Sequence, residues 1–354
     1  MTGTEPEQSV PHTSAQSRMA VPDSALLALL GSRDENLRTA EDLLDADVHV
    51  RGNELTLTGS PADVAFAERV FAELITLASR GQQLGPDAVR RTVAMLSEES
   101  TARGGRRAGE SPAEVLSLDI LSRRGRTIRP KTLNQKRYVD AIDKNTIVFG
   151  IGPAGTGKTY LAMAKAVQAL QSKQANRIIL TRPAVEAGER LGFLPGTLYE
   201  KIDPYLRPLY DALHDMIDPE SIPKLMAAGT IEVAPLAYMR GRTLNDAFII
   251  LDEAQNTTPE QMKMFLTRLG FGSQIVVTGD TTQIDLPGGS RSGLLVVQDI
   301  LEGVEDVHFA QLTSTDVVRH RLVSDIVDAY SRWDAHQPSD DRLVPNRADR
   351  RRRR

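Results

Sequence analysis

A glycine-rich octapeptide between two regular segments is the part of the sequence best suited to chemistry. It follows the apolar run Ile147–Phe149 and precedes a segment with Ala, Leu and Met at helical spacing, so a strand, a loop and a helix are predicted. Glycines let several backbone N–H groups converge on one anion, and the helix adds the positive end of its dipole. We therefore expect phosphate binding by Gly152, Pro153, Ala154, Gly155, Thr156, Gly157, Lys158 and Thr159.

Two side chains of this loop have separate expected roles. Lys158 is placed to reach the β and γ phosphates of a nucleotide, and the Thr159 hydroxyl is placed to bind Mg²⁺, which prefers hard oxygen ligands. A glycine turn without a ligand would not explain why a strand and a helix flank it in this order. ATP and Mg²⁺ are the predicted ligands, and ATP is favoured over GTP because no guanine-recognising Asn/Thr-Lys-x-Asp motif occurs.

A second motif supplies two adjacent carboxylates. The run Ala247–Leu251 is apolar, which predicts a strand buried on both faces, and Asp252 and Glu253 follow at its end. Because side chains alternate along a strand, the two carboxylates can do different work. Asp252 is expected to hold Mg²⁺ together with Thr159, and Glu253 to orient or deprotonate the water that attacks the γ-phosphate. An apolar run followed by Asp-Glu is common, and the upstream phosphate loop is what favours this interpretation.

Three further residues are candidates for the same site. Gln135 lies on a helix expected just before the phosphate-loop strand, where its amide could read the N6 and N7 edge of adenine. Gln283 lies in a polar turn after a third core strand and could sense the γ-phosphate. Arg319 precedes the last expected helix, and arginine is the residue of choice for neutralising charge on a phosphoryl group in transit.

Composition and charge narrow the class of protein. The chain has 354 residues, enough for two domains, and no apolar stretch approaches the 18 residues or so that a membrane span needs. The first twenty residues do not resemble a secretory signal. Cysteine is absent, which removes disulfide and thiolate chemistry and suits a cytoplasmic protein. The formal net charge of −4 argues against nucleic-acid binding through bulk positive charge, so any such contact must come from local basic patches.

Shifts in composition divide the chain into five parts. We predict a disordered tail over 1–20, a small α+β domain over 21–96, a linker with one short helix over 97–131, an ATPase core over 132–335 and a disordered basic tail over 336–354. The arginine run that ends the last tail can bind polyanions or simply be solvated. The second half of the linker is also basic, and the same two interpretations apply to it.

The small domain has a recognisable order of elements. Two helices around Gly31-Ser32-Arg33-Asp34 precede a hairpin turning at Gly52-Asn53 and a third helix over 61–80 capped by Ser60. This arrangement resembles KH-like RNA-binding domains, in which a glycine loop between helices clamps the sugar-phosphate backbone. The loop here lacks the second glycine of that clamp, so docking or oligomerisation remains an alternative role.

The core resembles PhoH-like ATPases, which are relatives of superfamily 1 helicases. The resemblance covers about 132 to 333 and rests on five motifs in order: GPAGTGKT, TRPAVEAGERLGFLPG, DEAQNTTPEQMKMFLTRLG, TGDTTQIDLP and DVVRH. It implies an α/β fold, a RecA-like P-loop NTPase core beside the KH-like α+β domain, with ATP hydrolysis linked to RNA. It also implies a homo-oligomeric ring, often a hexamer, with nucleotide between subunits, and work beside a YbeY-type endoribonuclease and the ribosome.

The resemblance assigns further roles residue by residue. Gln135 falls in the adenine-reading position, Gln283 in the sensor and Arg319 in the arginine-finger motif. Arg182 falls in the loop that helicase relatives turn toward the nucleic-acid strand. Superfamily 1 helicases use two RecA-like domains in one chain, and one core here leaves no room for a second, so we expect Arg319 to act in trans within an oligomer.

Two rival functions compete with an ATPase that moves on or remodels single-stranded RNA. The first is a nucleotide-switched oligomeric scaffold that recruits an endoribonuclease or a ribosomal partner without unwinding. The catalytic carboxylates argue against a pure switch. The second is a small-molecule kinase, which is not supported because no lid or acceptor-binding segment is visible in the sequence.

Overall fold

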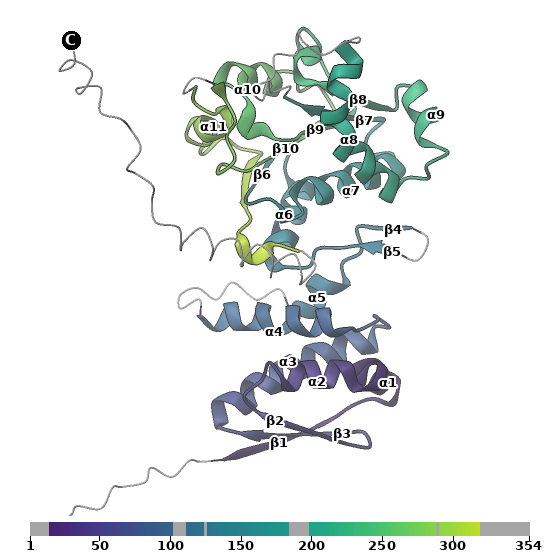
Figure 1. Ribbon diagram of the computed structural model, residues 1–354, viewed down its shortest axis with the longest axis vertical. Helices are drawn as coiled ribbons and strands as arrows, with labels where there is room; N and C mark the ends of the chain where they lie inside the picture. The colour runs from purple at the N-terminus through teal and green to yellow at the C-terminus, as the bar shows by residue number, and fades with distance from the viewer. Residues whose placement is uncertain (1–13, 102–110, 124–125, 184–197, 288–289, 319–354) are drawn as a thin grey trace, which may run out of the picture.

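The computed structural model describes residues 14–101, 111–123, 126–183, 198–287 and 290–318. Figure 1 shows a small unit with a sheet at its outer side and a larger α/β unit, joined through α5 (Pro112–Ser117). Three parts of the predicted site and tails lie outside the described residues: Arg319, residues 184–196 of the 181–196 motif, and the basic tail. None of the described helices combines the length and the apolar character that crossing a bilayer requires.

The small unit packs helices on one face of a three-stranded antiparallel sheet. Its strand order is β1-β3-β2, and Val48, Leu55 and Leu57 point into a core shared with α3. The helix-loop-helix, the hairpin and the Ser60 cap agree with the KH-like prediction, and Gly31 lies between α1 and α2. The elements are β1 (Ala15–Ala20), α1 (Asp23–Leu30), α2 (Glu35–Glu41), β2 (Asp47–Arg51), β3 (Glu54–Gly59), α3 (Pro61–Ser79) and α4 (Pro86–Thr101).

The prediction of disorder over 1–20 is wrong for Ala15–Ala20, which form β1. This strand pairs antiparallel with β3, from Ala15 opposite Gly59 to Ala20 opposite Glu54. Its inward-facing positions are Ala15, Ser17 and Met19, and all three are only half-buried. Met19 is the only large apolar side chain among them, so the segment carries little hydrophobic signal. Pairing with a distant strand rather than local propensity forms this element.

The segment predicted as a linker is largely structured where the model describes it. Helix α5 starts with a capping box of Ser111 and Glu114 and buries Val115 against Leu77 of α3 and Leu133 of α6 (Leu133–Lys144). A hairpin of β4 (Leu121–Arg123) and β5 (Arg126–Ile128) follows. Two of the basic residues here serve the fold: Arg123 donates to the His214 carbonyl and pairs with Asp218, and Arg129 pairs with Asp119.

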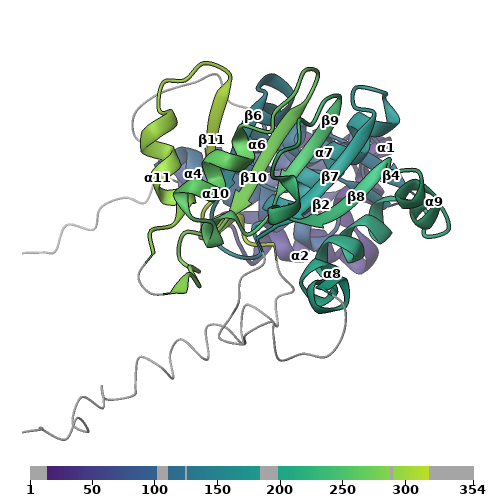
Figure 2. The ribbon, with the colours of Figure 1, turned by 90° about the horizontal axis from the view of Figure 1, so that it is seen from above.

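The core unit is a six-stranded parallel sheet in the order β11-β6-β10-β9-β7-β8, which Figure 2 shows side by side. The strand that ends in Asp252 is thus separated from the phosphate-loop strand by one inserted strand, as the resemblance implies. The strands are β6 (Ile147–Ile151), β7 (Arg177–Arg182), β8 (Ile231–Pro235), β9 (Ala247–Leu251), β10 (Gln274–Gly279) and β11 (Val307–Gln311).

Helices cover both faces of this sheet, which explains why its strands are apolar throughout. On one face, α6, α7 and α8 pack on alternate strand residues such as Ile178 and Ile250. On the other, α10 and α11 pack on their neighbours, such as Ile179 and Ile249. The remaining core helices are α7 (Lys158–Gln171), α8 (Leu198–Met216), α9 (Ile222–Ala227), α10 (Pro259–Leu266) and α11 (Gly293–Leu301).

Candidate active site

The phosphate loop joins β6 to α7, as predicted, and its backbone needs glycine. Gly155 and Gly157 have φ values of 85° and 79°, a left-handed region that other residues rarely adopt. At Gly152 a Cβ atom would lie 2.4 Å from the carbonyl oxygen of Leu312, so only glycine fits beside the segment after β11. The sequence order strand, glycine loop, helix N-terminus therefore produces the backbone concavity that binds phosphate.

Lys158 lies inside this concavity. Its side chain is 8% exposed, and its ammonium donates to the carbonyl oxygens of Gly152 at 2.6 Å and Pro153 at 2.8 Å. Burial lowers the pKa of Lys158 below the usual lysine range, and the nearby Asp280 carboxylate opposes that shift. The Lys158 ammonium, which has lost much of its hydration, is therefore held where phosphate oxygens would bind to it.

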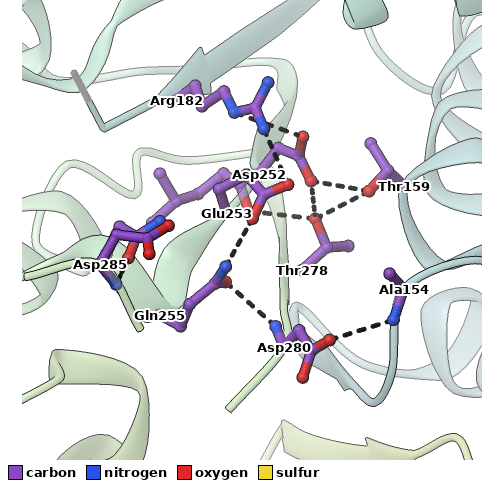
Figure 3. Close-up of polar contacts among 11 residues, drawn as sticks. Ala154, Thr159, Arg182, Asp252, Glu253, Gln255, Thr278, Asp280 and Asp285 are labelled. Carbon is purple, nitrogen blue, oxygen red and sulfur yellow. Dashed lines mark hydrogen bonds and ion pairs between the residues drawn. The ribbon is translucent and has the colours of Figure 1, made fainter. Parts of the chain in front are cut away.

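The sheet register brings three polar residues into one row. Leu251 is paired with Thr181 on one side and Val277 on the other, so Arg182, Asp252 and Thr278 follow side by side at the carboxyl ends of β7, β9 and β10. This row faces the start of α7. The Thr159 hydroxyl donates to Asp252 Oδ1 at 2.7 Å, and the Thr278 hydroxyl donates to the same oxygen at 2.8 Å (Figure 3).

These oxygens fit Mg²⁺ of the kind that accompanies a nucleotide. Within the residues that the model describes, no group of three or more His, Cys, Asp or Glu side chains could hold a metal by itself. The chain instead offers the Asp252 carboxylate and the Thr159 hydroxyl beside the phosphate loop. Mg²⁺ is commonly bound by one or two carboxylates together with substrate phosphates and waters, so this sparse donor set matches its preference.

Glu253 follows Asp252 but turns to a different part of the site. Its backbone has φ 53°, a left-handed value that is uncommon for a residue other than glycine. Its carboxylate accepts a bond from Gln255 and lies 2.7 Å from Arg182 Nη2. It lines a cleft of about 280 Å³, together with Ala154, Gly155, Gly157, Lys158, Thr159, Tyr160, Asp252, Gly279, Asp280 and Gln283.

The fold brings most of the predicted site residues together. Three loop residues do not line the cleft: Gly152, Pro153 and Thr156. Their oxygen atoms instead accept hydrogen bonds from the Lys158 ammonium. Gln283 also lines the cleft, and its role as a γ-phosphate sensor stays a prediction. Arg319 lies outside the described residues, although the N–H of the preceding Val318 donates to the carbonyl oxygen of Gly155 in the phosphate loop.

Gln135 is placed behind the loop rather than in the cleft. Its side-chain nitrogen donates to the carbonyl oxygens of Thr156 at 3.0 Å and Asp316 at 3.3 Å, and its side-chain oxygen accepts from the Lys131 N–H at 2.7 Å. The residue is 3% exposed. Its amide braces the phosphate loop in this structure, and it can read adenine only if these bonds are exchanged.

Arg182 also differs from its expected surroundings. The resemblance directs it toward a nucleic-acid strand, whereas its guanidinium here pairs with Glu253 and lies 3.9 Å from Asp252 Oδ2. Sequence reasoning missed Gln255, Thr278 and Asp280 altogether. In the sequence, these residues are marked only by their position at or just after the ends of two predicted strands. That position assigns no role to them until the order of the strands in the sheet is known.

Comparisons with known proteins show the family of this chain. A family model described as "PhoH-like protein" matches residues 127–331. The PhoH-like protein of Mycobacterium tuberculosis (strain ATCC 25618 / H37Rv) is 74% identical over 319 residues, covering 90% of this chain and 88% of its own. The PhoH-like protein of Bacillus subtilis (strain 168) is 49% identical over 312 residues, covering 88% of this chain and 95% of its own.

Solved structures give a weaker likeness. The crystal structure of Pif1 helicase from Candida albicans is 15% identical, covers 59% of this chain and 45% of its own, and has a TM-score of 0.31, too low to support a statement about activity. The family model, by contrast, covers more than half of the chain, and the relatives match nearly all of it. The cleft is that of a P-loop ATPase, and the chain belongs to the PhoH-like protein family.

Proposed function

We propose that this protein is a Mg²⁺-dependent enzyme that hydrolyses ATP and couples hydrolysis to the binding or remodelling of single-stranded RNA. The observation that carries the proposal is the convergence of Lys158, Thr159, Asp252 and Glu253 on one cleft at the carboxyl ends of a parallel sheet. These residues come from the phosphate loop and from a strand that is far away in the sequence. Ligands of open α/β sheets bind at this edge.

Each of these residues has a defined task in hydrolysis. The phosphate-loop N–H groups and Lys158 bind the β and γ phosphates and hold the γ-phosphate in line with the attacking water. Thr159 and Asp252 hold Mg²⁺, which neutralises charge on the phosphate oxygens when it is bound. Glu253 orients that water and accepts its proton, since its carboxylate lies in the same cleft and is bound by Gln255.

The coupling to RNA rests on family membership and on the KH-like unit. Its Gly31 loop lies between two helices and exposes Arg33, as a backbone-contacting loop would. The net charge of −4 requires that any RNA contact be local. The same proposal includes a homo-oligomeric ring, the hexamer that the resemblance implies. It also includes a cytoplasmic location and work with a YbeY-type endoribonuclease or the ribosome.

The assembly and its coupling to RNA are tested by the steady-state ATPase rate at increasing protein concentration, with and without single-stranded RNA, alongside the mass in solution. We expect specific activity to rise with assembly and RNA to stimulate it several-fold. A slow rate that is indifferent to RNA and to concentration would favour the alternative, a nucleotide-switched scaffold.

Mixing two inactive variants shows whose phosphate loop Arg319 serves. The single core among the described residues suggests action in trans, whereas the Val318 N–H, one residue before Arg319 in the sequence, donates to the Gly155 carbonyl oxygen of its own chain. If Arg319 acts in trans, a mixture of Lys158→Ala and Arg319→Ala chains regains activity, because some interfaces combine an intact loop with an intact arginine. If it acts in cis, the mixture stays inactive.

A further inference from the structure

Both oxygens of the Glu253 carboxylate are bound by side chains of the same protein. Arg182 Nη2 lies 2.7 Å from Oε1, and the Gln255 side-chain nitrogen donates to Oε2 (Figure 3). The backbone of Glu253 is left-handed, with φ 53°. Such a conformation costs energy and persists only when the surrounding structure holds it. The direction of this carboxylate is therefore set from two sides.

Gln255 connects Glu253 to the phosphate loop. Its side-chain oxygen accepts the N–H of Asp280 at 3.0 Å, and Asp280 Oδ2 accepts the N–H of Ala154 at 3.0 Å. Because the Asp280 N–H can only donate, the oxygen of the amide must face it, and the nitrogen must face Glu253. Gln255 is 1% exposed, so water does not compete for these bonds.

Arg182 reaches the same carboxylate from the neighbouring strand. It is the last residue of β7, directly beside the end of β9, and its side chain is 20% exposed. Its Nε also lies 3.9 Å from Asp252 Oδ2, so one guanidinium faces both carboxylates of the motif. The planar fork of arginine suits this arrangement because its donors are fixed relative to one another.

We propose that Arg182 and Gln255 are positioning residues for Glu253. They lock the carboxylate in the direction that hydrolysis needs, and Gln255 makes that direction depend on the phosphate loop through Asp280. This inference rests on the proposed ATPase function. Because both residues act through Glu253, their loss should lower kcat and leave the KM for ATP nearly unchanged.

Gln255→Glu tests the bond to Glu253 with the smallest change. The variant keeps the shape of the side chain and an oxygen for the Asp280 N–H, but it replaces the donor that faces Glu253 by a second carboxylate. We expect kcat to fall by about 10- to 100-fold, the scale of a small misplacement of a catalytic group.

Arg182→Gln and Arg182→Lys test the other side. Glutamine removes the charge, and we expect a fall in kcat of similar size. Lysine keeps a cation but loses the fork, so it should restore part of the rate. Such a partial rescue of turnover by Arg182→Lys would indicate a positioning role. If Arg182 were merely structural, the two variants would differ in stability and not in turnover.

Two matched controls lie in the same region. Asn256→Asp makes the same chemical change in the adjacent amide, whose side-chain oxygen accepts the Asp285 N–H at 2.8 Å. Arg242→Gln removes a guanidinium that pairs with Glu232 at 2.6 Å and 2.7 Å on the far side of β7. Both should keep kcat within about twofold of the unaltered chain, and the affinity of every variant for a fluorescent ATP analogue shows that its site is folded.

The possible results separate this inference from the function on which it rests. If Glu253→Gln abolishes turnover while Gln255→Glu and Arg182→Gln match the controls, the positioning role is wrong and the ATPase assignment stands. A rise in turnover for Arg182→Gln also overturns the inference, because Arg182 would then restrain Glu253 instead of aligning it. If the unaltered chain fails to hydrolyse ATP with Mg²⁺ and RNA present, both fall.

Discussion

Glu253→Gln is expected to bind ATP with almost unchanged affinity and to lose nearly all turnover. Glutamine has the size of glutamate and can still accept the bond from Gln255, but it cannot take a proton from water. General-base catalysis contributes about 10²- to 10⁴-fold, so kcat should fall by that amount. The measurement is phosphate release at saturating ATP, together with equilibrium binding of a fluorescent ATP analogue.

Glu232→Gln is the matched control for this variant. Glu232 is also a half-buried glutamate paired with an arginine, Arg242, and it lies on β8 outside the cleft. The Arg242 guanidinium holds the pKa of Glu232 below its usual range, so its removal should cost some stability while leaving turnover intact. Unchanged turnover in Glu253→Gln would contradict the assignment of the water-activating residue.

Lys158→Ala should lose both nucleotide binding and turnover. A hydrogen bond to a charged group contributes about 1.5–3 kcal/mol, so each lost phosphate contact should weaken ATP binding by about 10- to 100-fold. Lys165→Ala is the control, because Lys165 lies on the same helix, is also 8% exposed and pairs with Asp143 outside the cleft. Equal ATP affinity in the two variants, measured by isothermal titration, would show that Lys158 does not bind phosphate.

The pH dependence of ATP binding provides a second check on Lys158. Only the protonated amine attracts phosphate, and burial lowers its pKa from the ordinary value of 10.5. The affinity of the unaltered chain should therefore decline as the pH rises, starting below the range in which an exposed lysine would deprotonate. In Lys158→Ala this decline should be absent.

The parts of the site that lie on one stretch of chain could be predicted from the sequence. The phosphate loop and the Asp252-Glu253 pair are local patterns, and the structure places them as expected, between β6 and α7 and directly after β9. The order of the strands was available only through the family resemblance. Gln255 and Asp280 could not be predicted, because their roles come from bonds between the ends of β9 and β10 and the phosphate loop.

A strand and a single residue show where local sequence patterns are insufficient to predict the structure. Strand β1 has no hydrophobic alternation of its own and exists because β3 offers it an edge. Gln135 was predicted to face the nucleotide because its amide matches adenine, but the same donor and acceptor also match the backbone of the phosphate loop. Residue type indicated the chemistry of this amide and could not indicate its partner.

The most direct test of the central claim is steady-state phosphate release from ATP by the full chain. It should be measured with Mg²⁺ and with excess EDTA, in the presence and absence of single-stranded RNA, with Lys158→Ala as the baseline. We expect saturable release above that baseline that EDTA abolishes, because Asp252 and Thr159 hold the metal beside the phosphates. Release no greater than that of Lys158→Ala under every condition would contradict the assignment of this cleft as an ATPase site.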